Sequence, residues 1–501
     1  MSLSIVYSRA LHGMGAPRVT VETYVAGGLP AFHIVGLADT EVRESRERVR
    51  AAIQCIGMSF PAGRIVVSLS PADLPKKSGR FDLPIALGVL LASGQIDTCH
   101  LGPMGLGNMV FAGELSLSGV LMDVAAPLML ALEVRRDQPD AMLILPAGNA
   151  MQAARVPGLH VLAAHTLDAV VAHLGGQARL PVPSTASEPS PDDTPCLSAI
   201  RGQQQGRLAL EVVASGGHSM LMCGWPGVGK SMLAQRLPGI LPPMTPIAAL
   251  EVAARFERYG LVHAGGRAPP YRAPHHHATV AALLGDARGS AGELALADGG
   301  VLFLDELPEF GRLTLEALRE PLENGWVSFS RASRKLRYRA RCQLIAAMNP
   351  CPCGWDGHPR RKCVCGPGEV ARYRARLSGP LLDRIDVHMA LGGLEADWMA
   401  GPPGEASDIV RERVAVARAR QIARQGCLNA SLEGDALTRI ARPTADAWGM
   451  LTQTVTRQEW SARAMQRALR VARTLADVAD SESIGPAHVA QAIQFRALDR
   501  R

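Results

Sequence analysis

The stretch Gly224-Trp225-Pro226-Gly227-Val228-Gly229-Lys230-Ser231 decides the fold of the central part of the chain. It matches the pattern G-x-x-x-x-G-K-[ST] in full and lies between an apolar, strand-like run, Ser219–Cys223, and a helical stretch. Glycines allow backbone N–H groups to wrap a phosphate, and the helix N-terminus adds its positive end. A chance glycine turn is the alternative. We expect a parallel α/β sheet in which Lys230 reaches the β- and γ-phosphates of ATP and Ser231 ligates Mg²⁺.

A second apolar run, Val301–Leu304, ends in two acidic residues, Asp305 and Glu306. An apolar strand of a parallel sheet carries its last residues to the ligand-binding edge. We expect Asp305 to hold Mg²⁺ and Glu306 to act as general base on the attacking water. Such a pair is weak evidence alone, and becomes strong evidence downstream of a complete phosphate loop.

Two further residues complete the expected catalytic set. Asn349 closes a third strand, Gln343–Ala347, where its amide would orient the attacking water or sense the γ-phosphate; a simple turn former is the alternative. Arg384 lies between acidic residues in Leu-Leu-Asp-Arg-Ile-Asp, 381–386. In a ring of subunits this arginine would reach the neighbour's γ-phosphate, the alternative being a local salt bridge to Asp383 or Asp386.

Composition and charge limit the class of protein. The 501 residues are 47% apolar and 20% charged, which excludes a disordered chain and gives a prior of about three domains. No uncharged apolar run approaches the roughly 18 residues of a membrane helix, and no signal segment opens the chain, so we expect a cytoplasmic protein. The net charge is +7, yet residues 331–376 alone carry 12 basic residues against Asp356 and Glu369. This excess predicts a polyanion-binding surface or a solvated arginine-rich face.

Proline-rich stretches divide the chain. Residues 181–195 hold five prolines among small polar residues and predict a linker. Residues 1–180 before it read as mixed strands and helices, with strands at Ala31–Gly36 and Arg64–Leu69 and helices at Glu41–Ile53 and Leu83–Ala92. A second break, Gly401-Pro402-Pro403-Gly404, separates residues 196–400 from a helical block, 401–501, with helices expected at Ile409–Arg424 and Ala462–Val478.

Together these motifs resemble the magnesium-chelatase-like AAA+ ATPases of the YifB/ComM family. The resemblance rests on the phosphate loop, the Asp-Glu strand and two longer stretches, Ala-Ala-Met-Asn-Pro-Cys-Pro-Cys-Gly at 346–354 and Leu-Ser-Gly-Pro-Leu-Leu-Asp-Arg-Ile-Asp at 377–386. Shorter stretches extend it to both ends of the chain: Phe-His-Ile-Val-Gly-Leu at 32–37, Ser-Pro-Ala-Asp-Leu at 70–74, and Ser-Ala-Arg at 461–463.

The resemblance implies an α/β protein of three modules. These are a Lon-protease-like α+β domain at 1–180, an AAA+ core at 196–400, and a helical lid at 401–501 with Arg463 contacting the same γ-phosphate as Arg384. A Lon-type protease needs a serine nucleophile and a lysine. Because the matching stretch 77–83 has Phe81 where the nucleophile belongs, we expect no proteolysis.

The resemblance also implies a β-hairpin before the strand that ends in Asn349, pointing into the pore of a hexamer. Trp326–Ser330 and Leu336–Arg341 are the expected strands, with residues 331–335 at the tip. We expect Arg331, Arg334, Lys335 and Arg337 to contact DNA phosphates without sequence preference.

Four of the ten cysteines, Cys351, Cys353, Cys363 and Cys365, form the pattern C-x-C-x₉-C-x-C. Four thiolates in two close pairs suit a tetrahedral structural zinc site, although C-x-C is tighter than the usual spacing. Reduced free cysteines or a disulfide are the alternatives, and His358 inside the loop could replace one thiolate. A run of histidines, His275–His277, is more typical of a packing or solvated feature than of a metal site.

Two functional classes follow. The family implies an ATP-driven hexameric DNA motor, a helicase that drives branch migration in natural transformation. The alternative is a magnesium-chelatase-like or protein-remodelling ATPase without DNA activity. The basic hairpin favours DNA.

Overall fold

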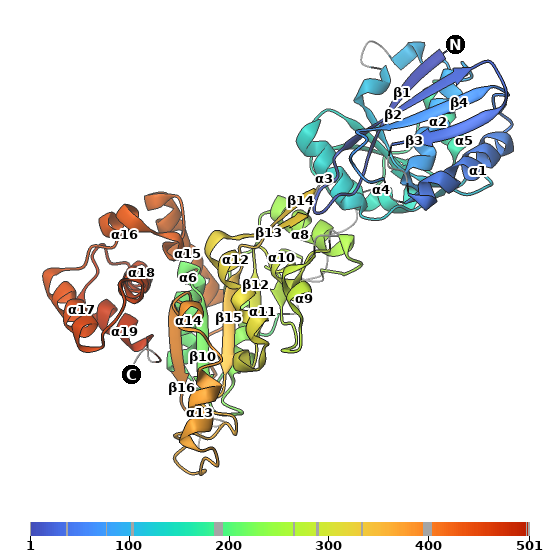
Figure 1. Cartoon of the computed structure of the whole chain (residues 1–501). Helices are drawn as coiled ribbons and strands as arrows, with labels where there is room; N and C mark the ends of the chain where they lie inside the picture. The colour runs from blue at the N-terminus through green and yellow to red at the C-terminus, as the bar shows by residue number, and fades with distance from the viewer. Residues whose placement is uncertain are drawn as a thin grey trace. The chain divides into compact units, whose positions relative to one another are not determined.

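A computed structural model gives the arrangement of the chain (Figure 1). It describes every residue except 1, 37–38, 77, 102–104, 185–193, 264–265, 287–289, 332–333, 394–402, 497 and 499–501. Most of the expected linker at 181–195, part of the expected break at 401–404, Lys77 and the centre of the expected hairpin tip therefore lie outside the described residues.

The chain forms two compact units. The first comprises Met1–Pro189 together with Pro246–His263, and the second comprises Ser190–Thr245 and Ala264–Arg501. Residues 246–263, which we had included in the ATPase core at 196–400, thus fold with the first unit. The segment expected as a separate lid at 401–501 folds within the second.

The first unit is built on a seven-stranded sheet of order β3-β4-β2-β1-β5-β8-β9. Strands β1, β2 and β4 are antiparallel neighbours, and the other pairs are parallel. The strands are β1 (Ser2–Arg9), β2 (Arg18–Ala26), β3 (Ala31–Val35), β4 (Arg64–Ser70), β5 (Met109–Phe111), β8 (Met142–Pro146) and β9 (His160–Ala164), with a small ribbon β6 (Glu114–Leu115) and β7 (Leu121–Met122). In β4, Ile65, Val67 and Leu69 are buried in alternation, as expected for a strand covered on one face.

Helices cover this sheet. They are α1 (Thr40–Cys55), α2 (Asp82–Ala92), α3 (Pro127–Asp137), α4 (Ala147–Ala153), α5 (Leu167–Leu174) and the inserted α8 (Pro246–Arg258). The helices expected at Glu41–Ile53 and Leu83–Ala92 are confirmed as α1 and α2. Leu250 and Ala254 of α8 are buried in the same apolar cluster as Leu130 of α3. Their i, i+4 spacing places both on one helix face, which explains why α8 belongs to this core.

The second unit is built on a five-stranded, fully parallel sheet of order β11-β12-β15-β10-β16. Its strands are β10 (Met220–Gly224), β11 (Tyr271–Arg272), β12 (Val301–Leu304), β15 (Gln343–Met348) and β16 (Val387–Leu391). The expected α/β class with a parallel sheet is confirmed, and β10, β12 and β15 lie within one residue of the expected strands. The sequence did not indicate β11 and β16.

Helices surround the second sheet, and a separate hairpin, β13 (Trp326–Arg331) with β14 (Arg334–Arg339), precedes β15. The helices are α6 (Gln204–Gly216), α7 (Lys230–Ile240), α9 (Val280–Leu284), α10 (Glu293–Leu296), α11 (Arg312–Ala317), α12 (Arg319–Asn324), α13 (Pro367–Arg374) and α14 (Gly379–Leu382). In Figure 1 the hairpin and α13 lie at opposite ends of the sheet.

The chain ends in a helical block. It comprises α15 (Ser407–Gln425), α16 (Gly434–Ile440), α17 (Ala445–Arg457), α18 (Ala462–Val478) and α19 (Pro486–Gln494). Val414 of α15 and Ala472 of α18 share one apolar core with Leu210 of α6, so this block is packed on the sheet domain. Among the described residues, no helix is long and apolar enough to cross a membrane.

Candidate functional site: two edges of one sheet

The phosphate loop lies at the carboxyl end of β10, as its sequence predicts. Gly227 and Gly229 have φ values of 80° and 93°, in the left-handed region that favours glycine. Gly229 is also the N-cap of α7, so the helix begins at Lys230 with its positive end at the loop. The loop therefore has the backbone that a phosphate requires.

Lys230 is buried and makes three hydrogen bonds. Its Nζ donates to the carbonyl oxygens of Gly224 and Trp225, at 2.6 and 3.1 Å, and to Oδ1 of Asn349 at 3.0 Å. Burial lowers the pKa of Lys230, while nearby Asp305 opposes this shift. The structure thus brings Asn349 of the third strand directly to the phosphate-loop lysine.

The Mg²⁺ candidates also meet. Ser231 Oγ donates to Oδ2 of Asp305 at 2.8 Å, and Oδ1 of Asp305 accepts the backbone N–H of Glu306 at 2.9 Å. A hydroxyl and a carboxylate are hard oxygen ligands of the kind that Mg²⁺ prefers. The pair fits the ion that we expected there.

Glu306, the candidate base, has a strained backbone and a partner that the sequence did not indicate. Its φ of 53° lies in the left-handed region, which is costly for a non-glycine residue and concentrates at functional sites. Its Oε2 lies 3.0 Å from Nδ1 of His276, and its side chain is half exposed. The histidine run, which we had regarded as a packing or solvated feature, therefore places one ring on the candidate base. The other two rings pack against it, that of His275 tilted and that of His277 edge-on.

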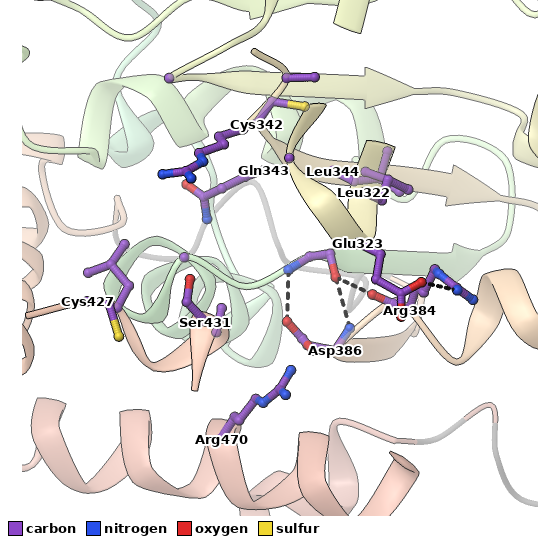
Figure 2. Close-up of a pocket in the computed structure, with 18 of the residues that line it drawn as sticks. Leu322, Glu323, Cys342, Gln343, Leu344, Arg384, Asp386, Cys427, Ser431 and Arg470 are labelled. Atoms are coloured by element: carbon purple, nitrogen blue, oxygen red, sulfur yellow. Dashed lines mark hydrogen bonds and ion pairs between the residues drawn. The ribbon is translucent and has the colours of Figure 1, made fainter. Parts of the chain in front are cut away.

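Arg384 has a partner different from the ones that the sequence suggested. Its Nη2 donates to a carboxylate oxygen of Glu323, 61 residues earlier (Figure 2). Its Nη1 donates to Pro380 O at 2.7 Å. Asp386 instead accepts hydrogen bonds from His218 and Arg467. Burial alone would raise the pKa of Asp386, but His218 and Arg467 lower it by more. The pKa therefore lies below its usual value, and the carboxylate stays ionised.

Arg384 lies on the rim of a cavity of about 1070 Å³. Six arginines and three carboxylates line it: Arg341, Arg384, Arg418, Arg463, Arg467 and Arg470, with Glu323, Asp386 and Glu433. Its volume slightly exceeds the range of about 300–1,000 Å³ for ligand pockets. The structure thus places Arg463, the expected lid arginine, beside Arg384 in a cavity with an excess of positive charge.

This cavity and the phosphate loop lie at opposite edges of the sheet. The cavity contacts Ser219, just before β10, and Ser219 Oγ donates to Arg384 O at 3.1 Å. Lys230 contacts Gly224, the last residue of β10. At about 3.3 Å per residue, the five steps of this strand separate the two sites by roughly 16 Å. Arg384 and Arg463 are therefore remote from the phosphate loop of their own chain.

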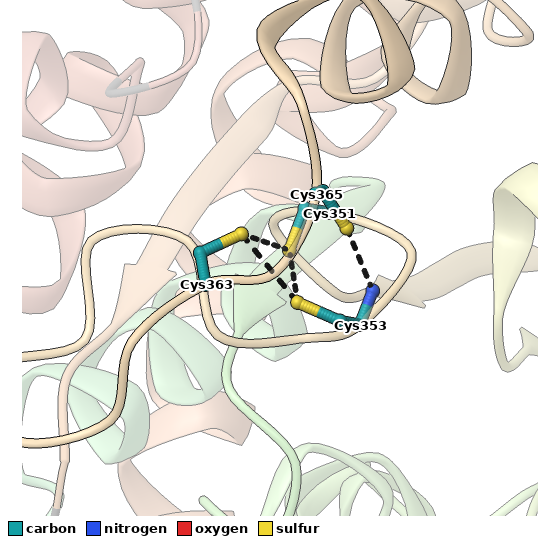
Figure 3. Close-up of side chains that lie close together, drawn as sticks. All are labelled: Cys351, Cys353, Cys363 and Cys365. Carbon is teal, nitrogen blue, oxygen red and sulfur yellow. Dashed lines mark hydrogen bonds between the residues drawn. The ribbon is translucent and has the colours of Figure 1, made fainter.

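The four cysteines come together (Figure 3). The Sγ atoms of Cys351, Cys353 and Cys363 are 3.4–3.6 Å apart, and Cys365 Sγ accepts the backbone N–H of Cys353 at 3.4 Å. A tetrahedron of sulfurs at the usual zinc distance of about 2.3 Å has edges of about 3.8 Å. The described thiols fit such a site and form no disulfide.

His358, the possible replacement ligand, does not join this group of thiols. Its Nδ1 accepts the backbone N–H groups of Arg360 and Arg361 at 3.0 and 2.8 Å. Its ring packs against Trp225 and Trp355. The side chain thus connects the cysteine loop to the phosphate loop.

The expected hairpin exists: its first strand is one residue longer than expected, and its second strand is shifted by two residues toward the tip, which is therefore shorter. The two strands pair from Trp326↔Arg339 to Arg331↔Arg334, which leaves only residues 332–333 between them. Arg337 is exposed, and its guanidinium lies 4.1 Å from the Trp326 ring centre. The side chains of Arg331, Arg334 and Lys335 lie outside the described part of the hairpin.

Comparisons with known proteins cover the chain almost completely. Three family models match: "Magnesium chelatase, subunit ChlI" at residues 196–399, "Subunit ChlI of Mg-chelatase" at 21–149, and "Magnesium chelatase, subunit ChlI C-terminal" at 404–496. YifB of Salmonella typhimurium is 42% identical over 508 residues, which cover 100% of this chain and 98% of that protein. Competence protein ComM of Haemophilus influenzae is 41% identical over 511 residues, with the same two coverages.

A shorter similarity concerns a quarter of the chain. The zygotic DNA replication licensing factor mcm3 of Xenopus tropicalis is 30% identical over 139 residues, 25% of this chain and 17% of that protein. The full-length matches and the three family models agree with the phosphate loop and its parallel sheet. The chain therefore belongs to the YifB/ComM family of magnesium-chelatase-like proteins, whose AAA+ relationship indicates an ATPase motor.

Proposed function

We propose that this protein is an ATP-driven DNA motor that works as a ring of identical subunits, a hexamer, and moves or unwinds branched DNA. The observation that carries the proposal is that the two edges of one sheet hold different sets of functional groups. The carboxyl edge holds the groups that bind a nucleotide, and the amino edge holds the arginine-lined cavity and the basic hairpin.

At the carboxyl edge, each residue has a role that follows from its contacts. Lys230 neutralises charge on the β- and γ-phosphates. Ser231 and Asp305 would hold Mg²⁺, which would supply further positive charge to the phosphates. Glu306 accepts the proton of the attacking water, and His276 orients its carboxylate. Asn349 senses the γ-phosphate, a role supported by its hydrogen bond to Lys230.

At the amino edge, Arg384 and Arg463 act on the nucleotide of a neighbouring subunit. A strand length separates them from their own phosphate loop, so a second copy must supply the phosphate that they stabilise. Such a head-to-tail contact closes into a ring when the rotation between subunits permits it. Glu323 holds Arg384 until the neighbour's triphosphate replaces it.

The hairpin β13–β14 supplies the contact with DNA. The segment 331–376 carries the local charge excess, and Arg337 is exposed on the hairpin. Phosphate contacts by arginine and lysine carry no sequence preference, as a translocating motor requires. The names of two relatives, a competence protein and a DNA replication licensing factor, support DNA as the substrate and natural transformation as the setting.

We also propose that the four cysteines hold one structural Zn²⁺, because their spacing matches a tetrahedral thiolate site. For the first unit we propose a Lon-protease-like fold that has lost proteolysis. Phe81 stands at the nucleophile position and is fully buried, so no hydroxyl is present there to attack a peptide.

A second candidate is a magnesium-chelatase-like motor that acts on a protein partner without DNA. The descriptions of the matching family models favour it. The ATPase rate with and without single-stranded or branched DNA distinguishes the two, because only a DNA motor is stimulated. Strand exchange on a synthetic four-way junction tests the proposal directly. No stimulation and no exchange by verified oligomers would leave the second candidate.

A further inference from the structure

The loop that carries the four cysteines lies directly on the phosphate loop. Gly354, between Cys353 and Trp355, has a φ of +83°, and a Cβ built there would lie 2.6 Å from Cγ of Pro226. Pro226 is the third residue of the phosphate loop. The backbone at Gly354 therefore lies against the Pro226 ring so closely that a side chain at position 354 would have to displace that ring.

Trp225, the second residue of the phosphate loop, is held by the cysteine loop. Its Nε1 donates to the carbonyl oxygen of Asp356 at 2.9 Å, and its ring centre lies 4.6 Å from that of His358 in an edge-on contact. A Cβ built at Gly393, two residues after β16, would lie 3.3 Å from Cζ3 of the Trp225 indole, so the indole also lies close to the end of that strand.

The same peptide segment reaches the cysteine cluster. The backbone N–H of Asp356 donates to Cys351 Sγ at 3.3 Å, while its carbonyl accepts from Trp225. Two hydrogen bonds therefore connect a candidate metal ligand to the phosphate loop. Arg374 of α13 fixes the loop from outside, with Nη2 at 2.8 Å from Asp356 Oδ2 and Nε donating to Pro350 O.

We propose that the cysteine loop, Cys351–Cys365, is a positioning device for the phosphate loop, so that metal in the four-cysteine site raises the affinity for nucleotide. The inference deepens the proposed function, since it rests on the zinc and ATP sites argued above. A bound metal would fix the positions of the four thiolates. It would thereby also fix the Asp356 carbonyl, which accepts from Trp225, and the backbone at Gly354, which lies against Pro226. Because such coupling is reciprocal, nucleotide raises the affinity for metal by the same factor.

Two glycines of the loop provide a matched pair of variants. Gly354 and Gly357 have φ values of +83° and +68°, so alanine strains the backbone at both positions, but nothing lies within 4 Å of a Cβ at Gly357. Gly354→Ala should raise the Kd of a fluorescent ADP analogue by about tenfold, within the usual range of coupling factors of 5–150. Gly357→Ala adds backbone strain of the same kind without a steric contact, so it should raise this Kd less than Gly354→Ala does.

The second measurement uses the metal. Full-length protein is assayed as purified, after a zinc-selective chelator that spares Mg²⁺, and after zinc is restored. Nucleotide affinity should fall about tenfold without zinc and return with it, and nucleotide should raise zinc affinity equally. Trp225→Phe, which keeps a ring but loses the indole N–H, should weaken this dependence on zinc.

The outcomes separate this inference from its premises. If Lys230→Ala binds nucleotide as wild type does, the ATP site is wrong. If purified protein holds no zinc, the zinc site is wrong, and the glycine pair alone decides the positioning role. Equal nucleotide affinity in Gly354→Ala and Gly357→Ala, or an unchanged affinity in protein verified as metal-free, would overturn the inference.

Discussion

The two edges of the parallel sheet in the second unit differ in how they are built. At the carboxyl edge, short contiguous motifs bring Lys230, Ser231 and Asp305 together, because neighbouring parallel strands end there. At the amino edge, the cavity collects arginines from the loop before β16, from α15 and from α18. The first edge forms a candidate site from its own chain. At the second edge Arg384 pairs with Glu323, and we propose that it exchanges this carboxylate for the phosphate of a neighbouring subunit.

The largest expected effect concerns the amino edge. Arg384→Ala should lower kcat for ATP hydrolysis by about 10³–10⁵, the usual effect of a charge-stabilising arginine supplied by a neighbour. Its Kd for nucleotide should stay near that of wild type. Arg319→Ala is the control, since it removes an arginine that is also paired with a glutamate but does not line the cavity. Weakened binding with unchanged kcat would place Arg384 in its own chain's site.

A substitution of the candidate base at the carboxyl edge should lower ATP hydrolysis by a slightly smaller factor. Glu306→Gln should keep ATP binding and lower hydrolysis by about 10²–10⁴, since an amide cannot accept the proton of the attacking water. Single-turnover hydrolysis and equilibrium binding measure the two effects separately. Glu309→Gln, a nearby exposed carboxylate paired with Arg376, should hydrolyse ATP normally. Wild-type turnover in Glu306→Gln would remove Glu306 as the base.

Asp386 contributes to the stability of the amino edge, because it pairs with His218 and Arg467 there. Asp386→Asn should lower the free energy of unfolding by about 3–5 kcal/mol, because His218 and Arg467 lose a buried partner. Asp480→Asn removes an exposed partner of Arg420 and should cost at most about 1 kcal/mol. Urea unfolding at pH 7 measures both.

The same carboxylate makes the free energy of unfolding depend on pH in the acid range. The pKa of Asp386 is lower in the folded than in the unfolded state. Its contribution to the free energy of unfolding is therefore complete above the pKa of the unfolded state, about 3.9, and declines as the pH falls toward the pKa of the folded state. Asp386→Asn should lack this part of the decline. Identical acid unfolding profiles for the two proteins would contradict the role of the carboxylate.

The smallest effect on basal hydrolysis is expected from the hairpin. Replacing Arg334, Lys335 and Arg337 together by Ala should leave basal ATPase intact, because the hairpin is apart from the phosphate loop. The plot of log affinity for DNA against log salt should flatten by about 0.7–0.9 for each lost phosphate contact. DNA-stimulated ATPase should fall with it.

A matched triple variant controls for net charge. Arg439, Arg442 and Arg457 are exposed in the C-terminal helical block, and their joint replacement by Ala removes the same charge. This protein should keep the wild-type salt slope in an anisotropy titration. If both triple variants behave alike, the hairpin is only a solvated basic face.

The sequence predicted the carboxyl edge well because its chemistry is local. A glycine turn, a strand end and their spacing determine where Lys230 and Asp305 meet. The contact of His276 with Glu306 could not be predicted, because His276 follows β11, a strand of only two residues that leaves no periodic pattern in the sequence. Only the sheet order, with β11 beside β12, brings it to Glu306.

The amino edge and the loop contacts were beyond sequence reasoning because they join distant residues. Glu323 and Arg384 are 61 positions apart, and Trp225 and Asp356 are 131 apart. Neither pair carries a motif. We expected no helix at α8, and nothing in the order of residues indicates that Leu250 packs in the core of the first unit.

The central claim is that the two edges of the sheet serve the nucleotides of two different subunits. Mixing Lys230→Ala with Arg384→Ala protein tests it most directly, because each variant lacks one half of every site. Mixed rings should recover about a quarter of wild-type ATPase, since random assembly pairs an intact phosphate loop with an intact arginine at that fraction of head-to-tail interfaces. Mixed oligomers, verified as such, that hydrolyse no more ATP than either variant alone would contradict the account.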